Sequence, residues 1–173
     1  STSKTCYDVV NFYSEKNLVK IFKEFGEEKQ SKKIAKAICA QREKLKFETT
    51  MQLASFIKRI KKTREKKNPA TKAFQALRME VNSEIDNLKK CLISLKNLMK
   101  RGGKIVVISF HSIEDRLVKN IFKHKENIHE KSIPIKKDPS PEFKVSKLII
   151  PSVQEVEMNV RSRSARMRII TKL

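Results

Sequence analysis

Residues 102–116, Gly-Gly-Lys-Ile-Val-Val-Ile-Ser-Phe-His-Ser-Ile-Glu-Asp-Arg, decide the fold class of this chain. The two glycines predict a tight turn, and the apolar run 105–108 predicts a strand covered on both faces, as in parallel α/β sheets. A polar loop and a new helix follow it. Because ligands bind outside the carboxyl ends of strands in open α/β sheets, we expect Ser109, His111 and Ser112 to line a substrate cleft.

The same loop also has a structural interpretation, which is compatible with the first. Ser112 is expected to N-cap the following helix, with Asp115 completing a capping box. Glu114, Asp115 and Arg116 are expected to hold the loop together through an internal ion pair. We expect His111 to act as a hydrogen-bonding wall rather than as a proton acceptor.

The charge of the chain is strongly positive. Forty Lys and Arg residues against nineteen Asp and Glu residues give a net charge of +21 and a pI near 10.1. Such a balance indicates a polyanionic partner, with nucleic acid as the first candidate. The alternative is a lysine-rich composition, typical of an AT-biased genome, spread over every solvated surface.

The composition excludes several classes of protein. The 173 residues are enough for one ordinary domain, or for a small domain plus part of another. We see no apolar run of membrane-spanning length and no secretory signal. Three scattered cysteines indicate reduced thiols in a cytoplasmic protein, and three histidines without ligand spacing predict no metal site. With only three glycines there is no Gly-rich cofactor loop, so we expect any such loop upstream of Ser1.

The first two-thirds of the chain is predicted to be helical. Apolar residues at helical spacing predict one helix capped by Ser14 and stopped by Gly26, a second over 28–44, and a third capped by Thr49 or Thr50. Asn68-Pro69 then starts a helical pattern that continues to Met99. This pattern is either one long helix or two helices joined at a kink near Asn82-Ser83.

The last third is predicted to close an α/β sheet. A helix over 113–122 follows the strand, and the proline-containing stretch 124–141 is expected to be an exposed loop. Two further strands, 143–150 and 165–172, are expected to be joined by Pro151 and a short acidic turn. This order matches the closing half of a doubly wound sheet with a terminal hairpin.

Three groups of residues are candidates for contacting RNA. Between Lys58 and Lys67 seven of ten residues are basic, which predicts a loop or frayed helix end that is either merely solvated or in contact with phosphates. Arg78 and Asn82, one helical turn apart, either are solvated or border a cleft. Arginines near the last strand suit bidentate contacts to phosphate, or alternatively protect an edge strand. The candidates are Lys61, Lys62, Lys66, Lys67, Arg78, Asn82, Arg161, Arg163 and Arg166, with Arg168 beside them.

Three long strings carry a family resemblance. They are the strings 68–84 (Asn-Pro-Ala-Thr-Lys-Ala-Phe-Gln-Ala-Leu-Arg-Met-Glu-Val-Asn-Ser-Glu), 102–119 and 159–168 (Asn-Val-Arg-Ser-Arg-Ser-Ala-Arg-Met-Arg). In this order they closely resemble the bacterial ribosomal RNA small-subunit methyltransferase H family, also called MraW. Asn68 and Val160 depart from the His and Pro usual in that family, and the loop 124–141 is shortened.

The resemblance implies a fold, a reaction and partners. The fold is the C-terminal half of a class I, Rossmann-like methyltransferase sheet, at residues 73–173, plus an all-α inserted helical domain for substrate recognition, at residues 1–72. The activity is transfer of a methyl group from S-adenosylmethionine to the exocyclic N4 of a cytidine in the decoding region of 16S rRNA. The partner is therefore the small ribosomal subunit. The cofactor-binding residues of the family are expected upstream of Ser1, so none is assigned here, and the oligomeric state is left open.

Three hypotheses follow for the chain by itself. The first is an rRNA methyltransferase represented by a fragment that is inactive alone. The second is a catalytically inactive RNA-binding remnant that lacks the cofactor site. The third is a ribosome-associated helical protein that uses only its basic helices.

Overall fold

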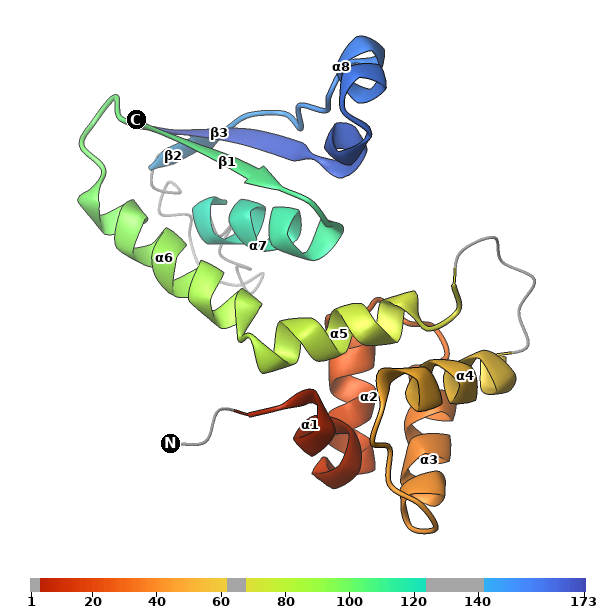
Figure 1. Cartoon of the computed structure of the whole chain (residues 1–173). Helices are drawn as coiled ribbons and strands as arrows, with labels where there is room; N and C mark the ends of the chain where they lie inside the picture. Colours follow the sequence, from red (N-terminus) through yellow and green to blue (C-terminus); the bar gives the residue numbers. More distant parts are fainter. Residues whose placement is uncertain (1–3, 62–67, 124–141) are drawn as a thin grey trace, which may run out of the picture. The chain divides into compact units, whose positions relative to one another are not determined.

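The computed structural model describes residues 4–61, 68–123 and 142–173 of the chain (Figure 1). The chain divides into two compact units, 1–84 and 85–173. The first, the helical unit, consists of α-helices, and the second, the sheet unit, combines helices with a small antiparallel sheet. The predicted α/β class is therefore confirmed. Among the described residues, no helix has the length and apolar character needed to cross a bilayer.

The helical unit begins with a short helix that the apolar pattern did not predict. Thr5 caps it, and Thr5 and Asp8 form a reciprocal capping box. Ser14 caps the next helix as predicted, accepting a hydrogen bond from the backbone N–H of Asn17. The helices of this unit are α1 (Cys6–Phe12), α2 (Glu15–Glu24), α3 (Ser31–Arg42), α4 (Thr50–Lys61) and α5 (Thr71–Val81).

The predicted apolar stripes form the core of the helical unit. One cluster joins buried residues from all five helices, so each helix turns its stripe inward. Its largest fully buried side chains are Leu18, Phe22, Ile34, Ile38, Ile57 and Leu77.

Gly26 directly follows Phe25, the C-cap of α2, so the helix stops where predicted, and the glycine has a packing role besides. The last helical residue of α2 is Glu24, and the left-handed conformation after it belongs to Glu27, with φ of 47°. A Cβ at Gly26 would lie 2.5 Å from the carbonyl oxygen of Lys72 in α5. The glycine therefore permits a close backbone approach between the end of α2 and α5.

The long apolar repeat after Asn68 forms two helices. After the C-cap Asn82, Ser83 adopts φ of +50°, and α6 (Glu84–Leu98) begins with the next residue. The break lies where the kink was predicted, because a left-handed residue cannot continue a right-handed helix. The two compact units also divide here, whereas residue 72 lies inside α5, which contacts α1 and α2. The assignment of 1–72 as an inserted domain stays a prediction.

The sheet unit contains three strands, β1 (Lys104–Ser109), β2 (Phe143–Val145) and β3 (Arg166–Lys172), in the spatial order β1-β3-β2. Both pairings are antiparallel, with Ser109 opposite Arg166 and Val145 opposite Ile170. The predicted terminal hairpin partners therefore do pair. The helical elements here are α6, α7 (Ser112–Phe122), α8 (Val153–Met158) and the 3-10 helix η1 (Val160–Ser164).

Two predictions about the strands were wrong in detail. The strand expected over 143–150 is only three residues long, and beyond it only Ile149 forms a bridge, to Met167. The expected short acidic turn is a helix, α8, because Ser152 N-caps it through the N–H of Glu155, and η1 follows.

The expectation that β1 is covered on both faces, as in a parallel sheet, is also wrong for the described residues. Ile105 and Val107 pack against the cluster of Leu92, Val118, Phe122, Phe143 and Ile170, on the side of α6 and α7. The opposite face is open, since Val106 is 57% and Ile108 58% exposed. Among described strands, β3 is the sole and antiparallel neighbour of β1. An apolar run predicts burial but does not say which part of a protein provides it.

Candidate functional site

The predicted substrate-lining residues lie at the end of β1 and the start of α7. Ser109, the last residue of β1, is 4% exposed, and its hydroxyl donates to the carbonyl oxygen of Arg166 on β3 at 3.2 Å. This hydrogen bond joins the ends of two strands. Ser109 therefore stabilises the sheet end from which the loop starts.

The N-cap of α7 is His111 and not Ser112, which corrects the predicted capping box. His111 has the extended backbone typical of an N-cap, and its Nδ1 accepts a hydrogen bond from the backbone N–H of Glu114 at 3.3 Å. Ser112 is the first residue of the helix proper. An imidazole nitrogen thus takes the place of the usual hydroxyl or carboxylate oxygen.

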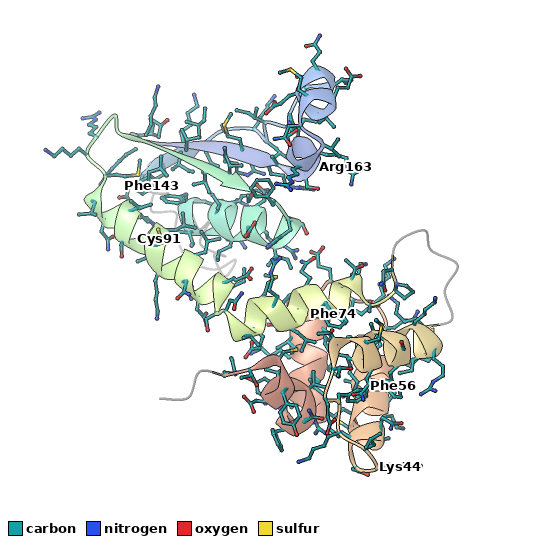
Figure 2. All side chains as sticks on the ribbon, viewed as in Figure 1. Lys44, Phe56, Phe74, Cys91, Phe143 and Arg163 are labelled. Carbon is teal, nitrogen blue, oxygen red and sulfur yellow. The ribbon has the colours of Figure 1, made fainter. Side chains whose placement is uncertain are left out.

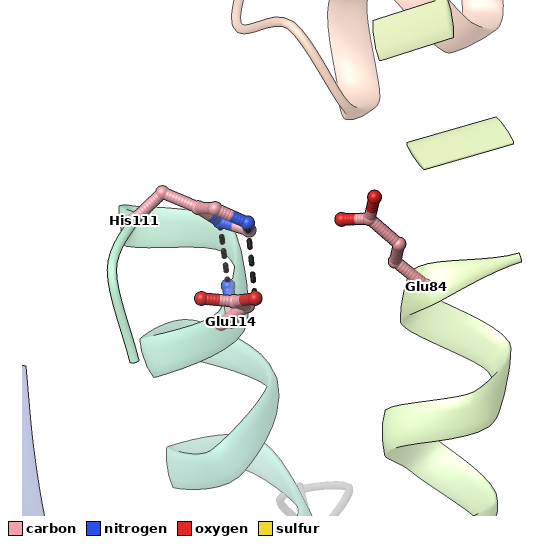
Figure 3. Close-up of side chains that lie close together, drawn as sticks. All are labelled: Glu84, His111 and Glu114. Carbon is pink, nitrogen blue, oxygen red and sulfur yellow. Dashed lines mark hydrogen bonds and ion pairs between the residues drawn. The ribbon is translucent and has the colours of Figure 1, made fainter. Parts of the chain in front are cut away.

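The carboxylate of Glu114 locks this loop (Figure 3). Its Oε2 accepts a hydrogen bond from the backbone N–H of Phe110 at 2.9 Å, and its Oε1 lies 3.2 Å from Nε2 of His111. Because Nδ1 of His111 is an acceptor, the neutral ring carries its proton on Nε2. The contact to Oε1 is close enough for electrostatic attraction, but Nε2 is buried and makes no geometrically acceptable hydrogen bond to a described residue. The contacts with Glu114 thus hold the imidazole of His111 in one orientation.

Asp115 connects α7 to β3, the central strand of the described sheet, instead of closing the loop internally. Its two carboxylate oxygens accept from Nε and Nη2 of Arg168 at 2.6 and 3.0 Å, and Nη1 of Arg168 donates to the carbonyl oxygen of Ser146 at 3.1 Å. The hydrogen bonds from Arg168 hold the pKa of the Asp115 carboxyl below its usual range, and raise the pKa of the guanidinium in turn. Arg168 is therefore an internal clamp and not a phosphate contact.

The other C-terminal arginines remain candidates for phosphate contacts. Arg161 and Arg163 are exposed on η1, as Figure 2 shows for Arg163, and Arg166 is half-buried opposite Ser109. The side chain of Asn159 caps η1 by accepting from the N–H of Arg161 at 3.1 Å. The alternative of edge-strand protection is wrong, because β3 is the middle strand of the described sheet.

The basic run in the helical unit is only partly a surface. Residues 58–61 are the last turn of α4, and Lys61 is buried, with its Nζ 2.7 Å from Oε2 of Glu28 and 3.0 Å from the carbonyl oxygen of Pro69. A buried, paired ammonium group does not bind RNA, so the prediction for Lys61 was wrong. The predictions for Lys62, Lys66 and Lys67 lie outside the described residues.

Arg78 and Asn82 share one partner. The guanidinium of Arg78 donates to both carboxylate oxygens of Glu84, at 2.8 and 3.0 Å, and the Asn82 amide donates to Oε1 at 3.3 Å. The side chain of Arg78 is still 57% exposed. The pair at helical spacing therefore fastens the α5–α6 junction, and its predicted RNA contact stays a prediction.

Comparison with known proteins shows which family this chain resembles over its whole length. The family model described as the MraW methylase family matches residues 1–173. Proteins named "Ribosomal RNA small subunit methyltransferase H" are 46% identical over 177 residues in Carboxydothermus hydrogenoformans, 43% over 177 in Clostridioides difficile and 40% over 173 in Persephonella marina. Each alignment covers 98% of this chain and 56–57% of the relative.

The chain belongs to the MraW methylase family. It spans a little over half the length of the curated relatives that it matches. In this MraW-family chain, two of the long strings meet in space although about forty residues separate them. String 102–119 forms β1, the loop and α7, and string 159–168 forms η1 and the start of β3. Ser109 pairs with Arg166 and Asp115 with Arg168, so both strings build one end of the sheet.

Sequence reasoning expected Glu114 to hold the MraW-family loop together but missed its partner His111, and it missed the partner of Asp115. Glu114, three residues after His111, is at the position of the acidic partner in a capping box, but histidine is not among the preferred N-caps. The pairing of Asp115 with Arg168 spans 53 positions and has no local signal. The spacing from an N-cap to its acidic partner was the one signal able to reveal Glu114.

Proposed function

We propose that this chain is the substrate-positioning part of an S-adenosylmethionine-dependent methyltransferase that modifies the exocyclic N4 of a cytidine in the decoding region of 16S rRNA. The observation that carries the proposal is the family match over the whole chain, together with relatives named as small-subunit rRNA methyltransferases. The net charge of +21 supports an RNA substrate.

The open face of the sheet supports a place within a larger fold. β1 has an apolar outward face, with Val106 and Ile108 more than half exposed, and it has one edge without a described neighbour. An exposed apolar strand edge favours pairing with a further strand. In the proposed arrangement, residues 73–173 are the C-terminal part of a class I methyltransferase sheet, and residues 1–72 are an inserted helical domain.

The described residues do not fit S-adenosylmethionine by themselves. The close backbone approach at Gly26 is to Lys72, and Gly103 meets the carbonyl oxygen of Lys100, so both are engaged in packing within the chain. Gly102 lies in the turn before β1, whereas a dinucleotide-type cradle follows a strand. The cofactor pocket would therefore lie in the part of a full-length family protein that this chain does not span.

The residues at the β1–α7 loop would position the substrate. Glu114 holds the His111 loop in one conformation through the N–H of Phe110 and the contact to the imidazole, and this ordered loop would border the target nucleobase. The exposed arginines Arg161 and Arg163 suit the phosphates of the same RNA. An exocyclic amine is a weak nucleophile, so orientation of this kind accounts for much of the rate that such a site supplies.

A chimera tests the proposal directly. In it, this chain replaces the matching segment of the Carboxydothermus hydrogenoformans relative, to which it is 46% identical. We expect the chimera to transfer tritium from methyl-labelled S-adenosylmethionine to small-subunit RNA, and nucleoside mass spectrometry to identify N4-methylcytidine. A folded chimera that binds both substrates but transfers no methyl group would overturn the proposal.

His111→Asn in the chimera separates positioning from capping. Asparagine is a good N-cap, so the midpoint of thermal unfolding should stay within about 2 °C of the parent, as expected for a change of less than roughly 0.5 kcal/mol. The variant keeps the cap but lacks the imidazole ring that packs beside Glu114, and we expect kcat to fall more than tenfold with little change in RNA affinity. An unchanged kcat would remove His111 from the site.

A second candidate function is a catalytically inactive RNA-binding remnant. It is compatible with the glycines of the described residues, which lie in packing contacts or in the turn before β1 and form no cofactor loop. Calorimetric titration of the chain with S-adenosylmethionine should show no binding under either function. The logarithm of the RNA association constant should fall linearly with the logarithm of the salt concentration, because phosphate contacts release counterions. An inactive chimera with intact RNA binding would favour the remnant.

A further inference from the structure

A groove beside α4 combines aromatic rings with cationic groups. It has a volume of about 220 Å³, and we call it the α4 groove. Its apolar part comes from Leu45, Phe47 and Phe56, and its cationic part from Lys46 and Arg59. Figure 2 shows Phe56 on α4, with Lys44 at the tip of the segment that connects α3 to α4. All lining residues belong to the helical unit.

The floor of the α4 groove is preformed. The side-chain amide of Asn11 makes two hydrogen bonds to the backbone of Phe47. It donates to the carbonyl oxygen at 2.9 Å and accepts from the N–H at 3.0 Å. The Phe47 ring then meets the Phe56 ring edge to face at 5.1 Å. A ligand entering the groove therefore finds its aromatic surface already ordered, which lowers the entropic cost of binding.

The polar groups around the groove are also held in place. The Arg59 guanidinium lies over the Phe56 ring, 5.3 Å from its centroid, and Lys46 Nζ lies 4.9 Å from the centroid of Phe12. The side-chain oxygen Oε1 of Gln52 accepts hydrogen bonds from the backbone N–H groups of Glu48 and Thr49. This fixes the side-chain NH₂ of Gln52 as a donor. Ser55 and Gln41 add a hydroxyl and a second amide.

These features suit one nucleobase. The groove is smaller than the roughly 300–1,000 Å³ of pockets for drug-sized ligands, which matches a single planar ring system. Proteins that hold single-stranded nucleic acid stack bases on aromatic rings and on arginine beside a cationic track for the backbone. Between residues 41 and 59 five basic residues outnumber two acidic ones, in agreement with an anionic ligand.

We propose that the α4 groove binds one unpaired base of single-stranded RNA, stacked against the Phe56–Arg59 pair, with the neighbouring phosphates near Lys46. The inference rests on the proposed RNA substrate and deepens it by assigning a contact to the helical unit. A base inside a duplex is already stacked and paired, so the groove selects unpaired RNA.

Fluorescence anisotropy with a labelled single-stranded RNA oligonucleotide tests the α4 groove in the full 173-residue chain. We expect Phe56→Leu and Arg59→Gln each to weaken binding about tenfold, because loss of a base-stacking partner has an effect of this order. Lys58→Gln is the matched control for Arg59→Gln. It removes the same charge from the neighbouring, exposed position of α4, and we expect about a twofold loss that shrinks as salt rises.

An abasic oligonucleotide of the same length distinguishes base stacking from charge. The wild-type chain should bind it more weakly than the normal RNA, and Phe56→Leu should not weaken that binding further. Circular dichroism confirms that each variant is folded. Equal losses of RNA affinity for Arg59→Gln and Lys58→Gln, or no loss for Phe56→Leu, would overturn the proposal that the groove binds a base, while the proposal that the chain binds RNA would stand. Failure of the wild-type chain to bind any RNA would overturn the proposed RNA substrate and the groove together.

Discussion

The helical unit closes its core on all sides with its own helices, whereas the sheet unit covers one face of its sheet and leaves the other open. Fifteen buried apolar residues form the helical core, against five in the described part of the sheet unit. Both units follow from the same kind of apolar pattern. The comparison teaches that an amphipathic helix buries its apolar stripe against its neighbours, whereas an uninterrupted apolar run in a strand does not ensure that both faces are covered within the described residues.

The ion pairs of the two units differ in the same way. The Lys61–Glu28 pair is sealed inside the helical unit, with both side chains at most 4% exposed. The Asp115–Arg168 pair lies at the sheet end, with side chains 11–12% exposed. The first pair lies within the core of the helical unit, and the second links α7, β3 and the backbone of Ser146.

The largest expected effect is truncation of the small core. Phe122→Ala removes the ring that packs edge to face on Phe143 at 5.3 Å, and it should lower the free energy of unfolding of the sheet unit by about 3–5 kcal/mol. Native-state hydrogen exchange should show lost protection in β1 and retained protection in α2 and α3. Equal losses in both units would break the comparison.

Breaking the sealed ion pair should come next. Glu28→Gln leaves the Lys61 ammonium buried beside a neutral amide, which should lower the stability of the helical unit by about 3 kcal/mol in urea unfolding. The double variant Glu28→Met with Lys61→Met removes both charges and should recover most of that loss. Lys58→Gln on the exposed side of α4 should change stability by less than about 0.5 kcal/mol. A double variant as unstable as the single one would contradict this account.

The clamp at the sheet end should depend on pH. Arg168 holds the pKa of Asp115 below its unfolded value. The contribution of the Asp115–Arg168 pair to the free energy of unfolding is therefore complete above the pKa of Asp115 in the unfolded chain, near 3.9. It is lost as the pH falls through the lower pKa of Asp115 in the folded chain. Asp115→Asn should destabilise the chain by about 2 kcal/mol at pH 7.

The midpoints of thermal unfolding of the wild-type chain and of Asp115→Asn, measured from pH 7 downward, test this clamp. The difference between them should shrink below about pH 4. A difference that stays constant with pH would show that the carboxylate charge does not contribute.

The smallest effect compares the two faces of one strand. Val106→Thr, on the open face, should change stability by less than about 0.5 kcal/mol, whereas Val107→Thr should cost about 1–2 kcal/mol because its hydroxyl is placed against the apolar core. Urea unfolding measures both. In the chimera with the longer relative, Val106→Thr should become as costly as Val107→Thr if the additional sheet covers this face.

Much of the local structure was predictable. Leu18, Ile34 and Ile57 lie in stripes whose period required helices with an inward face, and all three are fully buried. The break near Asn82-Ser83 was one of two predicted alternatives, and the apolar spacing itself continues across it from Val81 to Ile85. The strand 105–108 and the helix after it were also predicted within a residue or two.

The candidate site was less predictable for physical reasons. Lys61 belongs to a run of basic residues and has no local mark of burial, because its partner Glu28 is 33 positions away. In the sequence, nothing distinguishes Arg168 from the neighbouring arginines. Only the folded structure shows that Arg168, on β3, pairs with Asp115. His111 was singled out correctly as a loop residue, but its capping role depends on backbone angles that composition does not report.

The order of amino acids alone determined the helical periods, the cap at Ser14, the charge and the family, because these depend on neighbours within a few positions or on the string itself. The predicted N-cap Asn68 was wrong, because α5 begins at Thr71 with Ala70 as its N-cap. Tertiary structure alone decided which cations are buried, which arginine is clamped and which face of β1 is open. Those outcomes depend on groups far apart in the chain that meet only after folding, when burial and pairing change the energy of each charge.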